Sequence, residues 1–345
     1  VGSVPIVHAS QNERVLLVLP LHHTFPFTTG LVVPLYVGAT VAFENDLRRI
    51  RDRLHDSRAT IMLGVPALYA LMYRAILSRI EAEGRLEAFN KGLRLAETVK
   101  RRTGINVGRL VFRALHQRLG GSLRLMASGG APLPPDLVHK YAALGIPLIQ
   151  GWGLTETSPV ITGQVFSNWQ FYFTHHLERQ AGSVGAAIRG VDLAIIDVPE
   201  KNIYASISGE GELVVRGLNL MVGYYKNEAA TQAVMLEEWL RTGDIGRIDK
   251  DGNVYITGRA KFVIVLGSGE KVYPDEVEDV IARSRLVEDV CVIGRQARRP
   301  QRGDKERIEV AAVVYPNLEG VRERAASEKQ PLTEENIRRW FLADL

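Results

Sequence analysis

The sequence has one cysteine, Cys291, among 345 residues. This excludes a framework of disulfide bonds and is typical of a reducing compartment, so we predict a cytoplasmic protein. Long apolar runs are also absent. The longest, such as RVLLVLPL at 14–21, fall far short of the roughly 20 residues that a membrane-spanning helix needs.

A strong excess of charge of one sign is missing as well. The chain has 43 basic and 39 acidic residues, which gives a net charge of +4. Proteins that bind nucleic acid usually carry a clustered basic stripe, and only RQARRPQRGDK at 295–305 comes near one. We interpret this run as a solvated loop and expect no nucleic-acid partner.

Short apolar runs alternate with helical segments over the first half of the chain. The runs read as strands, and they are RVLLVLP (14–20), GATVAF (38–43), IMLGVP (61–66), LRLMAS (123–128) and IPLIQG (146–151). Strands that alternate with helices predict a mainly parallel sheet covered by helices. We therefore expect an α/β region over residues 1–175.

The residue pattern of the sequence changes after about residue 180. Short strands separated by Gly, Asn and Asp predict a small antiparallel, barrel-like region over 176–258. From residue 259 the order strand, Gly turn, strand, Pro-started helix and strand predicts a small α+β unit. We therefore expect a large domain over 1–258 and part of a small C-terminal domain over 259–345.

Three Gly-rich segments each follow an apolar run. They are SGGAP (128–132), QGWGLTE (150–156) and RTGD (241–244), the last of which we place in a loop after a helix ending in EEWL. A backbone without side chains lets a flat or charged ligand approach its amide groups closely. Ordinary strand-to-helix turns explain any one of these segments equally well.

The residue types in these segments suit a nucleotide and a metal ion. Trp152 offers a face for a base, Thr155 a donor for a phosphate, and Glu156 a hard oxygen ligand for Mg²⁺. The alternative is a buried Trp beside a helix-capping Thr. Asp244 could accept hydrogen bonds from ribose hydroxyls or be a plain turn residue, and His23 could line a pocket or pack in the core.

Together, these motifs resemble the adenylate-forming superfamily of acyl-CoA synthetases, firefly luciferases and peptide-synthetase adenylation domains. The segments that carry the resemblance occur in the family's order and are LPLHH, SGGAPL, GWGLTETSP, GELVVRGLNLMVGYY and WLRTGDIGRIDKDGNVYITGRAKFVIVLGSGEKVYPDEVE. The resemblance covers nearly the whole chain. The helical stretch 71–133 further resembles the bacterial long-chain fatty acyl-CoA synthetases.

The resemblance implies activation of a medium- or long-chain fatty acid. In this family a carboxylate attacks the α-phosphate of ATP with Mg²⁺, and the thiol of coenzyme A then displaces AMP from the acyl-adenylate. The fatty acid and CoA would be the partners. Two alternatives stay open: an acyl-AMP ligase or adenylation domain that loads a carrier protein, and a non-catalytic nucleotide-binding relative.

The resemblance also implies roles for individual residues. The nucleotide site would comprise Gly129, Gly130, Ala131, Gln150, Gly151, Trp152, Gly153, Leu154, Thr155, Asp244 and Arg259. His23, Gly130 and Gly153 would border the acyl pocket. Thr155, Glu156, Arg259 and Lys261 would act in catalysis, with Glu156 holding Mg²⁺ and Lys261 at the hinge of the small domain.

The chain departs from the family pattern at several places. The family's phosphate loop is not found in residues 1–18, and the C-terminal adenylation Lys is expected beyond residue 345. We therefore expect a fragment with little activity by itself. Phe262 also replaces a polar residue that is common after the hinge. A long-chain substrate would be compatible with peripheral membrane contact, and the oligomeric state cannot be read from the sequence.

Overall fold

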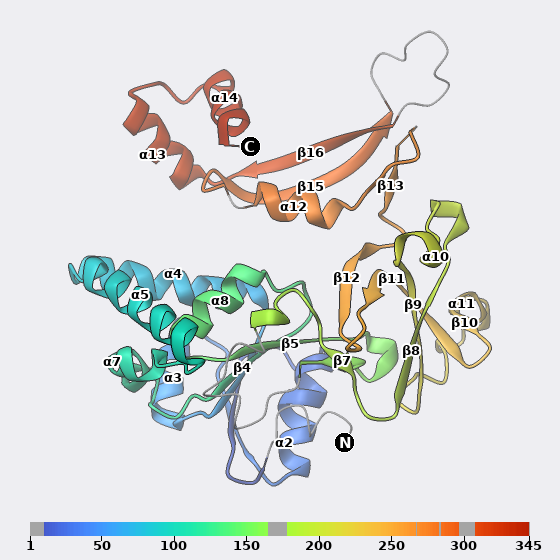
Figure 1. The fold of residues 1–345 in the computed structure, drawn as a ribbon, viewed down its shortest axis with the longest axis horizontal. Coiled ribbons are helices and arrows are strands. Elements are labelled where there is room, and N and C mark those ends of the chain that lie inside the picture. The colour runs from blue at the N-terminus through green and yellow to red at the C-terminus, as the bar shows by residue number, and fades with distance from the viewer. Residues whose placement is uncertain (1–9, 165–177, 267, 283, 297–307, 345) are drawn as a thin grey trace. The chain divides into compact units, whose positions relative to one another are not determined.

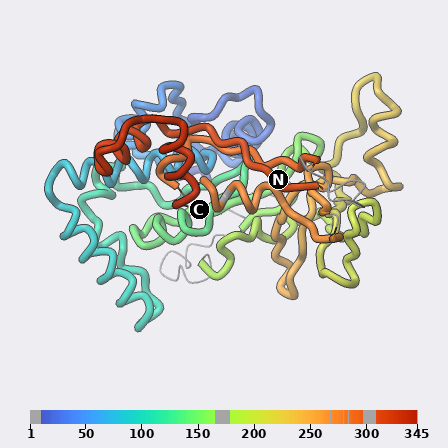
Figure 2. Tube along the Cα trace, turned by 90° about the horizontal axis from the view of Figure 1, so that it is seen from above, coloured from blue at the N-terminus to red at the C-terminus, as the bar shows by residue number. Residues whose placement is uncertain are grey.

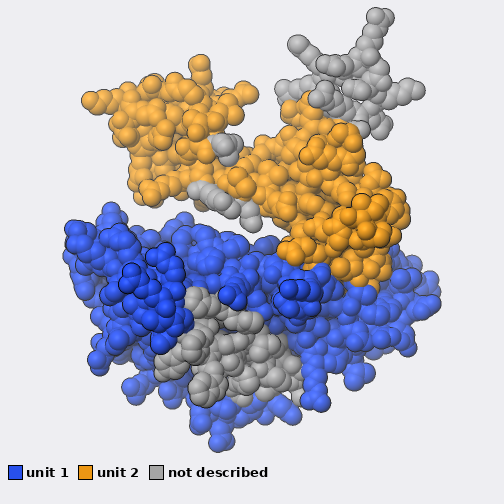
Figure 3. All heavy atoms as spheres, viewed as in Figure 1, with its two compact units in different colours: residues 1–194, 215–241, 248–255 blue, residues 195–214, 242–247, 256–345 orange. Residues whose placement is uncertain are grey.

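The structure, a computed structural model, describes residues 10–164, 178–266, 268–282, 284–296 and 308–344. Most of the basic run at 295–305 and the predicted boundary at 175/176 lie outside these ranges. The chain divides by its internal contacts into two compact units, which Figure 3 colours separately. Unit 1 comprises Val1–Ala194, Val215–Arg241 and Ile248–Tyr255, and unit 2 comprises Ile195–Val214, Thr242–Arg247 and Ile256–Leu345.

A seven-stranded sheet forms the centre of unit 1, with the strand order β2-β1-β3-β4-β5-β6-β7. The strands are β1 (Arg14–Leu17), β2 (Thr40–Phe43), β3 (Ile61–Gly64), β4 (Leu125–Ser128), β5 (Leu148–Trp152), β6 (Thr162–Gly163) and β7 (Ala186–Ala187). β1 to β5 pair in parallel, and β6 and β7 add antiparallel pairs at one edge. The predicted mainly parallel sheet is confirmed.

Helices cover both faces of this sheet (Figure 1). Because side chains alternate along a strand, Leu16, Met62 and Met126 pack into one cluster with the helices that follow β2. Val15 and Ile149 belong to a separate cluster on the opposite face. The helices on the first face are α3 (Ile50–Ser57), α4 (Pro66–Ala82), α5 (Leu86–Thr103), α6 (Gly108–Val111), α7 (Arg113–Arg118) and α8 (Pro135–Ala143).

Local signals set the ends of the long helices. α4 begins with Pro66 in its first turn, where the missing amide proton costs nothing. α5 ends at Thr103 and is capped by Gly104, whose φ of 76° suits glycine. The two helices contact each other, and Figure 2 lets the reader follow this part of the chain from above.

The opposite face of the sheet is covered by a π-helix, η1 (Pro26–Val32), that continues into α2 (Val33–Tyr36). Gly30 explains how closely this segment can approach. A Cβ on Gly30 would lie 2.6 Å from the Leu17 Cδ1 atom. A larger residue would therefore push the segment away from β1.

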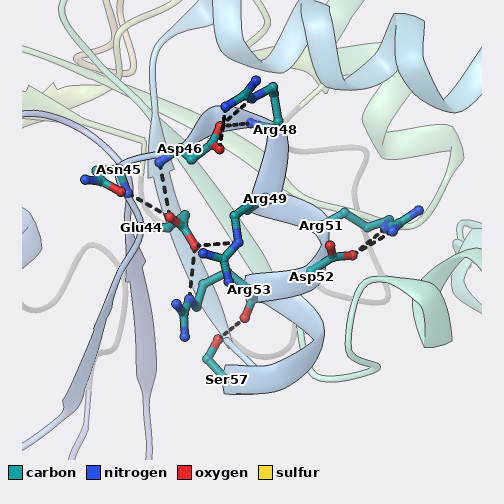
Figure 4. A network of polar contacts seen from close by, with 9 residues as sticks. All are labelled: Glu44, Asn45, Asp46, Arg48, Arg49, Arg51, Asp52, Arg53 and Ser57. Atoms are coloured by element: carbon teal, nitrogen blue, oxygen red, sulfur yellow. Dashed lines mark hydrogen bonds and ion pairs between the residues drawn. The ribbon is translucent and has the colours of Figure 1, made fainter.

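A charged network closes the turn between β2 and α3 (Figure 4). The buried Glu44 accepts hydrogen bonds from the amides of Asn45 and Asp46, each at 3.1 Å. Its other carboxylate oxygen lies 3.3 Å from Arg53 Nε. The backbone donor at Asp46, with Arg53 and Arg49 nearby, lowers the pKa of Glu44. This network connects the carboxyl end of β2, at the sheet edge, to the start of α3.

The Gly-rich region after residue 180 forms a five-stranded sheet, ordered β10-β11-β9-β8 with β12 paired to β11. The strands are β8 (Val191–Ile196), β9 (Gly211–Gly217), β10 (Met235–Leu236), β11 (Trp239–Ile248) and β12 (Val254–Arg259). Short helical turns at η5 (Pro199–Lys201) and α10 (Ala205–Ser208) join β8 to β9.

The prediction that RTGD follows a helix as a loop is wrong. The helix α11 (Glu228–Val234) ends before EEWL, and β10 and β11 then pair as an antiparallel hairpin. Glu237 forms its turn with a φ of 54°. Residues 241–244 are therefore part of β11, because the preceding Trp239 and Leu240 extend as a strand with one side buried.

The C-terminal part of unit 2 has the predicted α+β order. Its elements are β13 (Ile264–Val265), β14 (Lys271–Val272), α12 (Pro274–Ile281), β15 (Val287–Gln296), β16 (Ile308–Pro316), α13 (Leu318–Glu328) and α14 (Glu334–Asp344). Ile264, Ile281, Val287 and Val292 form its core. Among the described helices of the whole chain, none is long and apolar enough to cross a membrane.

Candidate active site

A cavity opens in unit 1 just beyond the carboxyl ends of β1, β3, β4 and β5. In open α/β sheets this is the edge at which ligands bind. The cavity brings together most of the predicted residues of unit 1, namely His23, Gly129, Gly130, Gly151, Trp152, Gly153, Leu154 and Thr155. Ala131 is exposed and lies outside the lining formed by the described residues.

The segment after β5 turns sharply through the one-turn helix η3 (Thr155–Thr157). The hydroxyl that caps this turn belongs to Thr157. It accepts a hydrogen bond from the amide of Leu154 at 3.0 Å and donates one to the Leu154 carbonyl at 2.9 Å. Because the buried Thr157 makes both bonds, Thr157 and not Thr155 is the threonine that caps this turn. The exposed Thr155 remains at the cavity.

Two glycines of this segment are required by the packing of the chain itself. A Cβ on Gly153 would lie 1.8 Å from the Pro159 carbonyl oxygen, and one on Gly151 would lie 2.8 Å from that of Thr162. Gly130 differs, because its φ is +81° and the nearest atom to an added Cβ is 3.9 Å away. Of these three glycines, Gly130 is therefore the one that borders open space.

Trp152 and Gln150 also have structural partners. Trp152 lines the cavity and packs against the apolar cluster of Ile161, Val191 and Val215. Gln150 is 4% exposed, and its side-chain amide donates to the Ser183 carbonyl at 2.8 Å. The aromatic face predicted for a base therefore has a fixed support, and Gln150 holds the end of β5 in place.

A second, apolar cavity adjoins the first. It lies between the sheet face that carries Ile61 and Leu63 and the covering segment that carries Val33. The two cavities share Phe25, Gly151 and Val160 in their linings. An apolar chain could therefore occupy the second cavity while its polar end lies in the first.

Glu156 is half-buried and is held by the segment that follows β9. The Tyr224 hydroxyl donates a hydrogen bond to Glu156 Oε1 at 2.8 Å, and the amide of Met221 donates to the Glu156 carbonyl at 2.7 Å. Asn219 Nδ2 donates to the carbonyls of Thr157 and Val160 at 2.9 and 3.0 Å. The loop with the predicted metal ligand therefore has a partner segment that the sequence interpretation did not assign.

The donor set at Glu156 fits Mg²⁺ better than an ion that needs a protein cage. Mg²⁺ usually binds through one or two carboxylates and substrate phosphates, and keeps several waters. Within the described part of the chain, no group of three or more His, Cys, Asp or Glu side chains could hold a metal ion. A single carboxylate beside a cavity is therefore compatible with a cation that arrives with its nucleotide.

In unit 2, Asp244 and Arg259 come together. Asp244 is buried, and its Oδ1 atom lies 3.1 Å from Arg259 Nε. The Arg259 side chain is 56% exposed, so the pair presents a half-open face. Lys261 and Phe262 follow directly and are exposed. The sequence does not predict this pairing, because the two residues lie on different strands, β11 and β12.

Several residues that contribute to the cavity or its support escaped the sequence interpretation. Phe25 and Val65 line the cavity, and Tyr224 and Asn219 support the loop beside it. Tyr224 is 68 positions from its partner, so no local spacing links the two. The only signal was that GYY belongs to one of the motifs on which the family resemblance rests.

Comparison with known proteins gives a consistent result. The family described as "AMP-binding enzyme" matches residues 3–225, and the "AMP-binding enzyme C-terminal domain" matches 261–303. The long-chain-fatty-acid–CoA ligase FadD15 of Mycobacterium bovis is 30% identical over 82% of this chain and 46% of its own length. The peroxisomal long chain acyl-CoA synthetase 6 of Arabidopsis thaliana is 31% identical over 95% of this chain and 45% of its own. The chain thus spans about half the length of these curated relatives.

Solved structures support the same fold. A fatty acyl CoA synthetase of Mycobacterium tuberculosis superposes with a TM-score of 0.59 at 26% identity, over 100% of this chain and 56% of the other. The o-succinylbenzoate CoA synthetase of Bacillus subtilis, in complex with its acyl-adenylate intermediate, gives a TM-score of 0.67 at 21% identity, over 96% and 57%. These likenesses confirm the predicted adenylate-forming fold.

Proposed function

The chain belongs to the AMP-binding enzyme family, and from this membership we propose that the protein activates a fatty acid with ATP and transfers it to coenzyme A. The observation that carries the proposal is the pair of adjoining cavities in unit 1. One is bordered by Thr155, and the other is apolar and lies over the sheet. Relatives named as long-chain-fatty-acid–CoA ligases favour a long acyl chain.

In this proposal the residues of the first cavity bind the nucleotide. Trp152 stacks on the base, Thr155 donates to a phosphate oxygen, and Gly129 and Gly130 border the adenine. His23, which lines the same cavity, would contact the acyl carboxylate. Fixed donors around the phosphorus would then stabilise charge that develops in the transition state.

Glu156 would hold Mg²⁺, which when bound neutralises phosphate charge and polarises the reacting group. The carboxylate is half-buried beside Thr155, and a tyrosine hydroxyl already orients it. The apolar lining of the second cavity excludes water from the acyl chain.

We further propose that the Asp244–Arg259 pair receives the ribose and that Lys261 lies at the hinge of a mobile small domain over 259–345. Asp244 would accept the ribose hydroxyls, and the half-exposed Arg259 would contact the ribose or a phosphate. A hinge suits a reaction with two half-reactions in one site, because each needs a different lid. We also infer a cytoplasmic location, because a reducing compartment suits a chain whose single cysteine, Cys291, is a free thiol.

A second candidate acceptor is the thiol of a carrier protein. A relative of Arabidopsis thaliana named long-chain-fatty-acid–[acyl-carrier-protein] ligase AEE15 is 33% identical over 67% of this chain. Both acceptors require the same acyl-adenylate, so the first half-reaction is common to the two proposals. Competition between CoA and a phosphopantetheine-bearing carrier protein for the preformed adenylate would separate them.

Binding of a non-hydrolysable acyl-adenylate analogue tests the proposal most directly. Isothermal titration of this chain with an acyl sulfamoyl adenosine should show saturable binding, with higher affinity for a hexadecanoyl than for an acetyl analogue. Apolar burial in the second cavity would supply the difference. A folded chain that binds neither analogue would contradict the proposal and favour the non-catalytic relative.

A further inference from the structure

The Tyr224 hydroxyl, on the segment after β9, donates a hydrogen bond to Glu156. The distance to Glu156 Oε1 is 2.8 Å, and the Tyr224 residue is 36% exposed. We propose that Tyr224 is a positioning residue that fixes the carboxylate of Glu156 for a divalent cation. This inference rests on the proposed function, in which Glu156 binds Mg²⁺.

The backbone around Tyr224 is attached firmly enough for such a role. Met221 and Asn219 hold the carbonyls of residues 156, 157 and 160 through hydrogen bonds of 2.7 to 3.0 Å. On the other side, the amide of Tyr224 donates to Thr231 Oγ1 at 2.9 Å. Hydrogen bonds therefore hold the backbone before Tyr224 and at Tyr224 itself. This distinguishes the contact from a mobile pair of surface side chains.

The chemistry of the contact favours a presented carboxylate. The Tyr224 phenol carries one proton, which it donates to Glu156 Oε1. A carboxylate otherwise rotates freely about its last torsion. With Oε1 held, Oε2 accepts no hydrogen bond from any residue that the structure describes and is available to a cation.

Substitution of Tyr224 by Phe removes only the hydroxyl. The probe is Mn²⁺, and free Mn²⁺ is measured by electron paramagnetic resonance with ATP held below the concentration of this chain, so that free ATP does not compete for the metal. Partners that orient metal ligands typically contribute 10–100-fold to metal affinity, so we expect the Kd for Mn²⁺ to rise about tenfold in Tyr224→Phe. The affinity for ATP in EDTA should not change, because the hydroxyl acts through the carboxylate.

Tyr225→Phe is the matched control. Its side chain is 87% exposed, and its ring lies 5.2 Å from the Lys226 ammonium, so this variant should bind Mn²⁺ as the unaltered chain does. Glu156→Gln should abolish the effect of the metal on ATP affinity. In that background Tyr224→Phe should add no further loss, as expected of two groups that act as one.

Other results would contradict the positioning role of Tyr224. An unchanged Mn²⁺ affinity in Tyr224→Phe would overturn the inference. An equal loss of ATP affinity in EDTA, or a further loss in the Glu156→Gln background, would mean that the tyrosine supports the loop without positioning the carboxylate. If ATP binds to the unaltered chain no better with Mn²⁺ than in EDTA, the metal-binding role of Glu156 in the proposed function fails, and the inference fails with it.

Discussion

Gly153 illustrates why a single residue can decide whether the site forms. Its place in the turn after β5 leaves no room for a side chain, because the Pro159 carbonyl oxygen occupies the position that a Cβ would take. Glycine in such a loop is usually explained by the approach of a ligand. Here the chain's own return path is the nearer cause, and the ligand benefits from a loop that is already folded.

Substitution of Gly153 by Ala should therefore destabilise the protein strongly. An added Cβ 1.8 Å from a carbonyl oxygen forces the backbone to move, and we expect a loss of about 3 kcal/mol or more in the free energy of unfolding. Urea denaturation followed by circular dichroism measures it. Gly130→Ala is the control, because it has open space but a left-handed φ, and should cost only about 1–2 kcal/mol. Equal losses in the two variants would contradict the steric explanation.

Among the elements, the segment between β9 and α11 is one of the most important for the site. Leu218 and Val222 are fully exposed, as in an ordinary surface loop. The residues between them nevertheless bond to the backbone of 156–160. The loop that carries Thr155 and Glu156 is therefore held by an element more than fifty residues away in the sequence.

Asn219→Ala tests this dependence. The substitution removes two hydrogen bonds from carbonyls of the loop, at Thr157 and Val160, and we expect a loss of about 1–2 kcal/mol in the free energy of unfolding. Binding of the acyl-adenylate analogue should weaken with it, since the loop borders the cavity. Leu218→Ala, at a fully exposed neighbour, should change stability by less than about 0.5 kcal/mol. An Asn219→Ala variant with unaltered stability and binding would show that the loop holds its shape alone.

The limits of sequence-based prediction are also clearest at the scale of elements. The parallel sheet was predictable, because apolar runs of strand length alternate with helical segments. The sequence predicts a loop where Asp244 lies in a strand, because the first residues of EEWL are polar like those of the helical segment before them. The turn at Glu237 becomes evident only from the pairing of β10 with β11. Contacts such as Tyr224 with Glu156 depend on tertiary packing alone. No local pattern of residues encodes them.

For the molecule as a whole, the two adjoining cavities of unit 1 suggest how one sheet could serve two parts of a substrate. The carboxyl ends of its strands border the first cavity, and one face of the same strands lines the apolar cavity. Phe25, Gly151 and Val160 belong to both linings. Occupation of one cavity should therefore affect binding in the other, and acyl chain length should affect the affinity for a whole acyl-adenylate.

Ala127→Phe should separate long from short acyl chains. Ala127 lines the apolar cavity on β4, and a phenyl ring there would fill space that a long chain needs. We expect the affinity for a hexadecanoyl-adenylate analogue to fall at least about tenfold, since each buried methylene contributes about 0.8 kcal/mol and two lost methylenes suffice. Affinity for the acetyl analogue should stay within a factor of about two. Ala229→Phe, at an exposed position of α11, is the control for added aromatic bulk and should bind both analogues normally. If Ala127→Phe weakened both analogues equally, the acyl chain would not occupy this cavity, and a different path from His23 would have to hold it.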